Sequence, residues 1–531
     1  MKVDTLIKNG FIVDGTGKEG TYGLVAMKDN KILLPRDEDD VVAKEIIDAT
    51  GSIVSPGFID IHTHSDLTLL IDSRGASKLS QGVTTEIIGN CGIAPTPCPP
   101  SRKEYIMESG TLLYAEKIDW GWEDYADYLQ RFADGNVSMN IGFYIGHGAI
   151  RASVMGFDDR APTKKEMDQM KKYVAEGMEL GAVGLSTGLG YAPGMYADVD
   201  EIAELCKVVV DYGGIYSTHI RNEGDQLIES IDEAIAVSRK SRVPLQISHL
   251  KAVGKQNWGK VITAIAHLED ARKEGIDAHY DFYPYTASST TLSSQLPNWA
   301  HEGGWEKLAE RLTNPETKKK MIDSVLYTIE ESVGWQSILI ASVRSKDLKQ
   351  YEGKNLDEIS KQMNIPPAEA MIHLLYEDKG FVRMIKFSMS DEDVNTVASG
   401  KLSMVGSDGY AIATDGPLSS GKPHPRSYGT FPRIFKKYQR EEQLFTVEEA
   451  VFKMTGSSAQ KLKFNKRGFI KDGYYADITI FKPENMDDIS SYTEPHQYSK
   501  GVEYVFVNGK KAYDGRSFLN PKSGVLLKPY S

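Results

Sequence analysis

Both ends of the chain carry short runs in which apolar and polar residues alternate, the pattern of half-buried β-strands. Near the amino end, Asn9-Gly10 lies between two such runs and is a strong signal for a two-residue hairpin turn. The pattern returns near the carboxyl end, for example in residues 476–481. Neither end is long enough to enclose a core by itself. We therefore expect residues 1–57 and 463–531 to pair into one small β-sandwich domain.

Between residues 58 and 462, short apolar runs alternate with longer segments in which apolar residues recur every three to four positions. This alternation predicts βα units and a parallel sheet. The strand-like runs lie at 53–61, 83–88, 139–145, 182–186, 215–218, 244–248, 276–282 and 402–406. Helical patterns between them lie at 164–179, 198–212, 225–240 and 258–274. The economical fold is α/β, a (β/α)8 TIM-like barrel over 58–462.

The connection between the seventh and eighth predicted strands, residues 283–401, is far longer than a barrel connection needs. We expect an insertion or lid at about 287–345, where tryptophan and leucine residues lie among polar ones. Because catalytic sites lie at the carboxyl ends of barrel strands, this insertion would lie beside the site and could cover it. The alternative is a subdomain that has no part in the chemistry.

Composition narrows the class of protein. The 531 residues carry a formal net charge of −12 with a pI near 5.5, which disfavours binding to nucleic acid or to an anionic membrane surface. No apolar run approaches the length of a membrane span, and we expect a cytoplasmic enzyme. The three cysteines, Cys91, Cys98 and Cys206, are too few for a disulfide framework.

Residues of the kind that bind metal follow the carboxyl ends of the predicted strands. His62 and His64 follow the first strand and face the same way, because strand side chains alternate. Such a pair alone is often only polar surface. The other candidates at strand ends are Cys91, His219, His249 and Asp408. Because the strand ends of a barrel meet at one mouth, these six residues predict a Zn2+ site with imidazole, thiolate and carboxylate ligands.

Asp408 is the candidate acid and base. The ion would lower the pKa of a bound water, and the carboxylate would take its proton, so that hydroxide attacks a carbonyl and the leaving nitrogen is protonated in turn. The alternative is an ordinary turn aspartate, because Asp408 lies in Ser407-Asp408-Gly409. We expect His147 to pack near the site without binding metal, and His279 to belong to the core.

Several motifs resemble the amidohydrolase superfamily and, within it, the N-acyl-D-amino-acid deacylases, or D-aminoacylases. The resemblance covers nearly the whole chain. The motifs of the superfamily in general are Lys8-Asn9-Gly10-Phe11-Ile12-Val13-Asp14-Gly15, Pro56-Gly57-Phe58-Ile59-Asp60-Ile61-His62-Thr63-His64 and Ala476-Asp477-Ile478. The deacylase motifs are Gly89-Asn90-Cys91-Gly92, Thr218-His219-Ile220-Arg221-Asn222-Glu223, Asp281-Phe282-Tyr283-Pro284-Tyr285 and His424-Pro425-Arg426.

The resemblance implies a zinc amidohydrolase that releases a carboxylate and a free D-amino acid from an N-acyl-D-amino acid. Zinc would be held tightly by Cys91, His219 and His249, with a second, weaker position at His62, His64 and Asp408. The fourth strand has no lysine of the kind that many amidohydrolases use to bridge two metals, and Cys91 takes its place. The implied substrate-binding residues are Lys251, Tyr283, Arg426, Tyr191 and Ser289. The segment 409–423 is longer than in those deacylases, which affects the placement of Arg426.

Two other functions stay open. One is hydrolysis of cyclic amides by an enzyme of the hydantoinase or dihydroorotase kind, against which the missing fourth-strand lysine argues. The other is a non-catalytic assembly protein that keeps the barrel and loses the metal. The oligomeric state cannot be predicted from these patterns.

Overall fold

Short, almost wholly buried strands form the sheet that positions the candidate site. The computed structural model describes residues 1–108, 117–133, 136–519 and 522–529. Within these residues, the parallel strands in sheet order are β8 (Phe58–Asp60), β9 (Val83–Ile88), β10 (Asn140–Gly146), β11 (Gly184–Gly188), β12 (Ile215–His219), β13 (Leu245–Ile247), β14 (Ala278–Phe282) and β18 (Ser403–Val405). The backbone N–H of Asp408 donates to the His62 carbonyl at 2.8 Å, and that of His64 to the Gly409 carbonyl at 2.9 Å. The last strand therefore meets the first, which confirms the predicted barrel.

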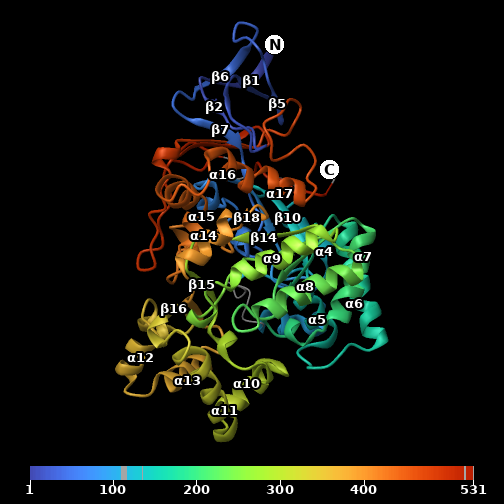
Figure 1. Cartoon of the computed structure of the whole chain (residues 1–531), viewed down its shortest axis with the longest axis vertical. Helices are drawn as coiled ribbons and strands as arrows, with labels where there is room; N and C mark the ends of the chain where they lie inside the picture. Colours follow the sequence, from blue (N-terminus) through green and yellow to red (C-terminus); the bar gives the residue numbers. More distant parts are fainter. Residues whose placement is uncertain (109–116, 134–135, 520–521, 530–531) are drawn as a thin grey trace.

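Helices pack around the barrel where the sequence predicts them. In order they are α6 (Lys164–Glu179), α7 (Val199–Asp211), α8 (Leu227–Ser241) and α9 (Lys260–Lys273). Consecutive members of this set pack side by side (Figure 1). The start of α6 is set by Thr163, whose side chain accepts from the Glu166 N–H while Glu166 bonds back to the Thr163 N–H. The other helices outside the insertion are α1 (Thr68–Ile71), α2 (Ala76–Leu79), α3 (Lys103–Glu108), α4 (Tyr125–Gln130), α5 (His147–Met155), α14 (Asp391–Ser399), α15 (Arg426–Arg433), α16 (Val447–Met454) and α17 (Gly456–Lys461).

The run at 53–61, predicted as one strand, is two strands of different sheets. Residues Ile53–Pro56 form β7, which pairs outside the barrel, and β8 begins only at Phe58. The chain crosses from one sheet to the other at Gly57. A side chain would not fit at this position, because a Cβ would lie 2.2 Å from the Thr84 side chain. Both halves are apolar and buried, so their hydrophobic pattern does not mark the division.

The two ends of the chain form a β-sandwich of two sheets. In the described residues the first sheet, in order, contains β5 (Lys31–Leu33), β4 (Val25–Lys28), β1 (Lys2–Lys8) and β6 (Val42–Asp48). The second contains β21 (Lys510–Tyr513), β20 (Val502–Val507), β19 (Ile478–Phe481), β7, β2 (Phe11–Ile12) and β3 (Thr21–Tyr22). Side chains such as Met27 and Ile32 from one sheet pack against Ile480 and Phe506 from the other. The antiparallel pairing of β19 with β7 joins the two ends of the chain.

The segment between β14 and α14 has a hydrophobic core of its own. Its antiparallel sheet contains β15 (Ala287–Thr291), β17 (Arg383–Phe387) and β16 (Ile338–Ser342) in that order. Its helices are α10 (Gly304–Thr313), α11 (Pro315–Val325), α12 (Leu356–Met363) and α13 (Pro367–Glu377). The range 287–345, where the sequence indicates an insertion, is the first part of this segment, which continues to β17. Figure 1 shows it at the end of the molecule opposite the sandwich.

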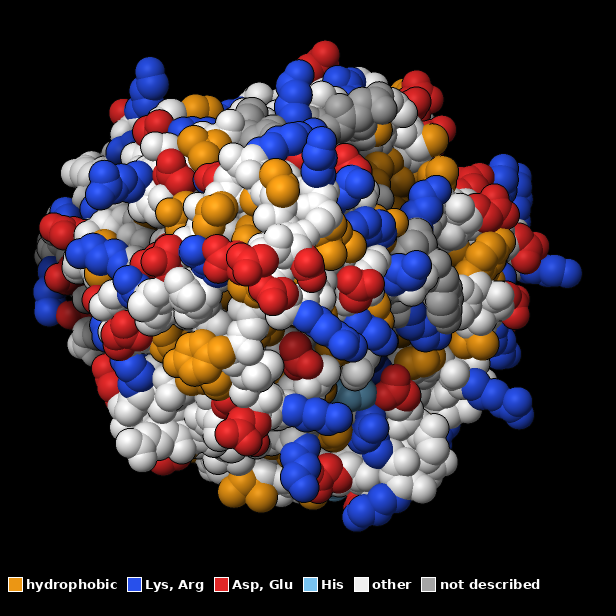
Figure 2. Space-filling view, turned by 90° about the horizontal axis from the view of Figure 1, so that it is seen from above, with side chains coloured by type: hydrophobic (Ala, Val, Ile, Leu, Met, Phe, Trp, Pro, Cys, Tyr) orange, Lys and Arg blue, Asp and Glu red, His pale blue; other side chains and the backbone are white. Residues whose placement is uncertain are grey.

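The outer surface carries charges of both signs. Lys and Arg side chains are interspersed with Asp and Glu over the face seen in Figure 2. Among the described helices, none is long and apolar enough to cross a membrane.

Candidate metal centre and active site

The six predicted metal ligands come together at one mouth of the barrel. Their donor atoms fall into two groups, and within each group these atoms lie within 4.8 Å of one another. The first group contains His62, His64, Cys91 and Asp408, and the second contains Cys91, His219 and His249. Cys91 belongs to both groups, so its sulfur lies between two possible metal positions.

The spacing of the donor atoms fits zinc. Cys91 Sγ lies 3.2 Å from His62 Nε2 and 3.5 Å from His249 Nε2. In a tetrahedral zinc site, bonds of about 2.3 Å to sulfur and about 2.0 Å to nitrogen place these donors roughly 3.5 Å apart. His219 Nδ1 is buried and has no hydrogen-bond partner in the described part of the chain. Thiolate and imidazole are ligands that zinc prefers, so the residues present fit this ion.

Three of these residues have a left-handed backbone conformation. The φ angles are +54° at Cys91, +36° at His249 and +49° at Asp408. Non-glycine residues in this region are uncommon and cost on the order of 1–3 kcal/mol each, and such residues cluster at functional sites. All three lie just beyond a barrel strand. The strained turns redirect their side chains toward the centre of the mouth.

Asp281, at the end of β14, orients two of the histidines. Its Oδ1 accepts from His62 Nδ1 at 3.0 Å and from the His249 backbone N–H at 2.8 Å. Its Oδ2 accepts from Gln246 Nε2 at 3.1 Å. With Nδ1 of His62 engaged in this way, Nε2 keeps its lone pair and faces Cys91.

Glu223 contacts the His249 ring at Nδ1, the nitrogen that does not face Cys91. Its Oε1 lies 3.0 Å from His249 Nδ1 and 2.5 Å from Lys251 Nζ. Burial raises the Glu223 pKa, but the charges of Lys251, His219 and His249 outweigh it and hold that pKa well below its usual range. Glu223 is therefore ionised, and it neutralises Lys251.

The charges of the mouth favour the ionised forms of Cys91 and Asp408. Burial raises the pKa of the Cys91 thiol, but the neighbouring His62 and His249 outweigh this effect and hold the pKa well below its usual value. Burial also raises the pKa of Asp408, and the Arg426 guanidinium overcomes it, so that this pKa too lies well below its usual range. A thiolate and a carboxylate are the forms that coordinate a metal.

Asp408 is held between the metal ligands and Arg426. Its Oδ1 lies 2.9 Å from His64 Nε2, and its Oδ2 lies 2.7 Å from Arg426 Nη1. The Arg426 guanidinium also lies over the Tyr283 ring, 4.8 Å from its centroid. The Tyr283 hydroxyl is buried without a hydrogen-bond partner in the described residues. Arg426 and Tyr283 therefore offer polar groups beside the candidate acid and base.

Tyr191 and Ser289 are also close to this centre. The Tyr191 ring lies 4.7 Å from the His219 ring, and its hydroxyl accepts from Thr290 at 3.1 Å. The Ser289 carbonyl accepts from Arg426 Nη2 at 3.0 Å. All five residues predicted to bind substrate thus surround the metal ligands.

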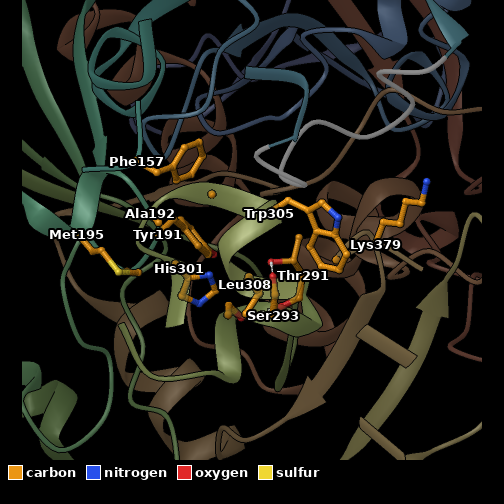
Figure 3. Close-up of a pocket in the computed structure, with 14 residues that line it drawn as sticks. Phe157, Tyr191, Ala192, Met195, Thr291, Ser293, His301, Trp305, Leu308 and Lys379 are labelled. Carbon is orange, nitrogen blue, oxygen red and sulfur yellow. Dashed lines mark hydrogen bonds between the residues drawn. The ribbon is translucent and has the colours of Figure 1, made fainter. Parts of the chain in front are cut away.

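A cavity opens beside Tyr191. It holds about 600 Å³ of empty space, part of it open to solvent. Figure 3 shows Tyr191 and Met195 on the barrel side and Trp305 and Leu308 of α10 on the insertion side. Burial lowers the pKa of the lining residue His301 to about 4, so His301 is neutral near pH 7. The lining combines apolar side chains such as Trp305 and Leu308 with the polar Ser293 and Lys379, so one wall of the cavity can hold an apolar group.

The residues expected to stay outside the metal centre do so. His147 is buried and bonds to Glu201 at 2.9 Å. His279 lies at the far end of its strand beside Asp277 with 20% of its side chain exposed, so the expectation that it belongs to the core is wrong. Burial raises the pKa of the Cys98 thiol to about 11, which leaves it protonated and unreactive.

Other residues of the site have no role assigned from the sequence alone. Asp281 and Glu223 stand inside the motifs quoted above, but spacing does not reveal their hydrogen bonds. Below the mouth, Lys78 of α2 bonds to Asp60 and Ser407 at 2.7 Å each and lies 3.1 Å from Glu86, all of them buried. This network joins the first, second and eighth barrel strands directly beneath His62 and Asp408.

Comparisons with known proteins find relatives along nearly the whole chain. A family model described as the amidohydrolase family matches residues 45–513. The D-aminoacylase of Alcaligenes xylosoxydans xylosoxydans is 31% identical over 528 residues, which are 99% of this chain and 97% of that protein. The N-acyl-D-glutamate deacylase of the same organism is 31% identical over 512 residues, 96% of this chain and 93% of that protein.

Solved structures give the same result. The N-acyl-D-glutamate deacylase of Bordetella bronchiseptica, in complex with zinc and a phosphonate that mimics the tetrahedral intermediate, matches with a TM-score of 0.83 and 29% identity over 99% of this chain and all of that one. A crystal structure of a D-aminoacylase matches with a TM-score of 0.81 and 30% identity, again over 99% of this chain and all of that one. A D-hydantoinase matches with a TM-score of 0.57 and 15% identity over the full length of both chains, which is a likeness of fold alone.

Proposed function

The chain belongs to the amidohydrolase family, and we propose that it is a zinc-dependent deacylase that hydrolyses N-acyl-D-amino acids to a carboxylate and a free D-amino acid. The observation that carries the proposal is the meeting of Cys91, His219 and His249 around one point, with Asp408 and Arg426 beside it. Full-length relatives about 30% identical to this chain are deacylases of N-acyl-D-amino acids, which supports the same reaction here.

In this proposal Cys91, His219 and His249 hold zinc tightly, and His62, His64 and Asp408 form the weaker second position. When bound, zinc supplies a Lewis acid that polarises a carbonyl and lowers the pKa of a water. The protein's part is to orient its ligands. Asp281 and Glu223 do this through the hydrogen bonds described above.

Asp408 moves the proton. As a carboxylate it takes a proton from the attacking water at Oδ1 or Oδ2 and then delivers it to the nitrogen that leaves as the amine. The Arg426 guanidinium, 2.7 Å from Oδ2, fixes the orientation of this group. The same guanidinium is a fork-shaped donor suited to a substrate carboxylate, with Lys251 and the free Tyr283 hydroxyl beside it.

The barrel also orients the substrate. Lys251, Tyr283 and Arg426 follow the sixth, seventh and eighth strands, whereas Tyr191 follows the fourth, on the opposite side of the ring. With the amino-acid carboxylate held on the first side, the acyl group extends toward Tyr191. It would then lie in the cavity lined by Trp305 and Leu308 (Figure 3).

Cyclic-amide hydrolysis fits less well. The end of the fourth strand carries Gly188, where a Cβ would lie 2.1 Å from the Cys91 carbonyl oxygen. A lysine cannot take that position while Cys91 keeps its place. A non-catalytic assembly protein has no need of the six potential ligands that this chain retains.

A substrate screen tests the proposal. The zinc-loaded protein is assayed with N-acetyl derivatives of both enantiomers of neutral and acidic amino acids, and with hydantoins. We expect hydrolysis of D-enantiomers and a decrease in kcat of about 10²–10⁴-fold for Asp408→Asn. Full activity in Asp408→Asn would contradict the proton-transfer role. Hydrolysis of hydantoins, with no turnover of N-acetyl-D-amino acids, would contradict the function itself.

A further inference from the structure

A single hydroxyl group holds both ends of the loop that carries Cys91. This loop, residues 89–92, follows β9 directly. Ser186 lies on β11, two strands away in the barrel, and is fully buried. Its Oγ donates to the Gly89 carbonyl and accepts from the Gly92 N–H at 3.0 Å. The hydroxyl therefore joins the first residue of the loop to the last.

The loop depends on such a link because its backbone is strained. The φ angles are +76° at Gly89, +54° at Cys91 and +70° at Gly92. A cysteine in this region persists only where the surrounding structure over-determines its conformation. In an ordinary four-residue turn the first carbonyl accepts directly from the fourth N–H, whereas here the Ser186 hydroxyl stands between the two groups. Both backbone groups are buried, so removal of the hydroxyl takes a needed partner from each.

The loop also lies directly against the backbone of β11. A Cβ at Gly188 would lie 2.1 Å from the Cys91 carbonyl oxygen, and a Cβ at Gly92 would lie 2.8 Å from the Gly188 nitrogen. On another side, Asp66 Oδ1 accepts from the Gly89 N–H at 2.9 Å. The loop therefore takes its position from β11 and from the segment after β8, as well as from the strand that it follows.

The position of the loop decides where the Cys91 sulfur lies. Its Sγ is 3.2 Å from His62 Nε2 and 3.5 Å from His249 Nε2, and these two histidines belong to the two different groups of candidate ligands. A sulfur shared between two positions tolerates little displacement, because each zinc–sulfur bond is about 2.3 Å long. Removal of a group that orients a metal ligand lowers metal affinity by about 10- to 100-fold.

Resting on the zinc-dependent function proposed above, we infer that Ser186 is a positioning residue of the metal centre. Its hydroxyl fixes the loop 89–92 so that Cys91 Sγ faces both groups of ligands. The hydrogen bonds described for Ser186 go to the loop backbone, so this residue acts on the metal through Cys91.

The next residue of the same strand supplies a matched control. Thr187 is also fully buried, and its Oγ1 bonds to the Tyr216 hydroxyl at 2.9 Å and to Thr218 Oγ1 at 2.8 Å. Because strand side chains alternate, these contacts lie on the opposite face of β11 from Ser186. Thr187→Val removes two buried hydrogen bonds, as Ser186→Ala does, but leaves the contacts of the Cys91 loop in place.

The first measurement is the zinc affinity of each full-length variant, by competition with a chelator that changes colour. We expect Ser186→Ala to raise the zinc Kd by about 10- to 100-fold. Ser186→Thr keeps the hydroxyl and should stay within about fivefold of the wild type. Thr187→Val should stay within about twofold, even if its melting temperature falls as far as that of Ser186→Ala.

The second measurement is the rate at which iodoacetamide alkylates each cysteine of the zinc-loaded protein, located by peptide mass spectrometry. We expect Ser186→Ala to raise the rate at Cys91 about tenfold, because the released loop opens more often. Cys98 and Cys206 are buried elsewhere in the fold, and their rates should not change. A general loosening of the structure would raise the rates at all three cysteines.

Each other outcome overturns the inference. Zinc affinity equal to wild type in Ser186→Ala would show that the loop is fixed without the hydroxyl. An equal loss of affinity in Thr187→Val, or alkylation that rises alike at all three cysteines, would show that Ser186 only supports the fold. A loss in Ser186→Thr as large as in Ser186→Ala would show that the hydroxyl is not the group that matters. These results leave the deacylase function standing, whereas wild-type protein that binds no zinc would end both.

Discussion

The charge of Asp281 can be removed without changing its shape. Its Oδ1 accepts one hydrogen bond from His62 Nδ1 at 3.0 Å and one from the His249 N–H at 2.8 Å. In Asp281→Asn one acceptor oxygen remains, but both bonds lose the assistance of a full charge, about 1 kcal/mol each. The sum of about 2 kcal/mol corresponds to roughly 30-fold weaker zinc binding.

The assay is competition for zinc with a chromophoric chelator at pH 7. The control is Asp277→Asn, which changes a half-exposed carboxylate just before the opposite end of the same strand. We expect Asp281→Asn to raise the zinc dissociation constant by about 10- to 100-fold with an unchanged circular dichroism spectrum, and Asp277→Asn to change it less than about twofold. Equal zinc affinity of wild type and Asp281→Asn would refute the role assigned to this carboxylate.

Three further changes have definite expected results. Cys91→Ser replaces an ionisable thiol by a hydroxyl that does not ionise, so the same competition should show zinc affinity lower by at least about 100-fold, and an unchanged affinity would exclude Cys91 as a ligand. Lys78→Met leaves Asp60 and Glu86 buried without their cation, at about 3–5 kcal/mol. Burial already raises the pKa of Glu86 to about 7, above its unfolded value. Protonation therefore neutralises the unpaired Glu86 carboxylate at pH 5 but not at pH 8, so the loss in melting temperature of Lys78→Met should grow over this range. A loss independent of pH would contradict this. Trp305→Ala should raise KM for N-octanoyl substrates about tenfold and leave N-acetyl substrates unaffected, whereas equal effects on both would place the acyl group elsewhere.

The sequence predicts the barrel, and which residues lie at its mouth, for one physical reason. A parallel strand buried on both faces must be apolar, so the polar residue that ends each run marks the mouth. That rule finds His62, Cys91, His219, His249 and Asp408 without any knowledge of distances.

The same rule cannot find residues whose role depends on contacts between strands. Asp281 stands out only when the His62 ring is placed against it, 219 positions away in the sequence. The sequence also does not show that the run 53–61 divides at Gly57, because both halves are apolar and buried although they belong to different sheets.

The pairing of β7 with β19 makes the sandwich a late product of synthesis. About 420 residues separate the two strands, so at ~5–20 residues per second a ribosome needs roughly 20–80 s to supply the partner. During that time the nascent chain presents an unpaired apolar edge at Ile53 and Val54. Heterologous expression should therefore benefit from added chaperones that cover this edge until β19 has been synthesised.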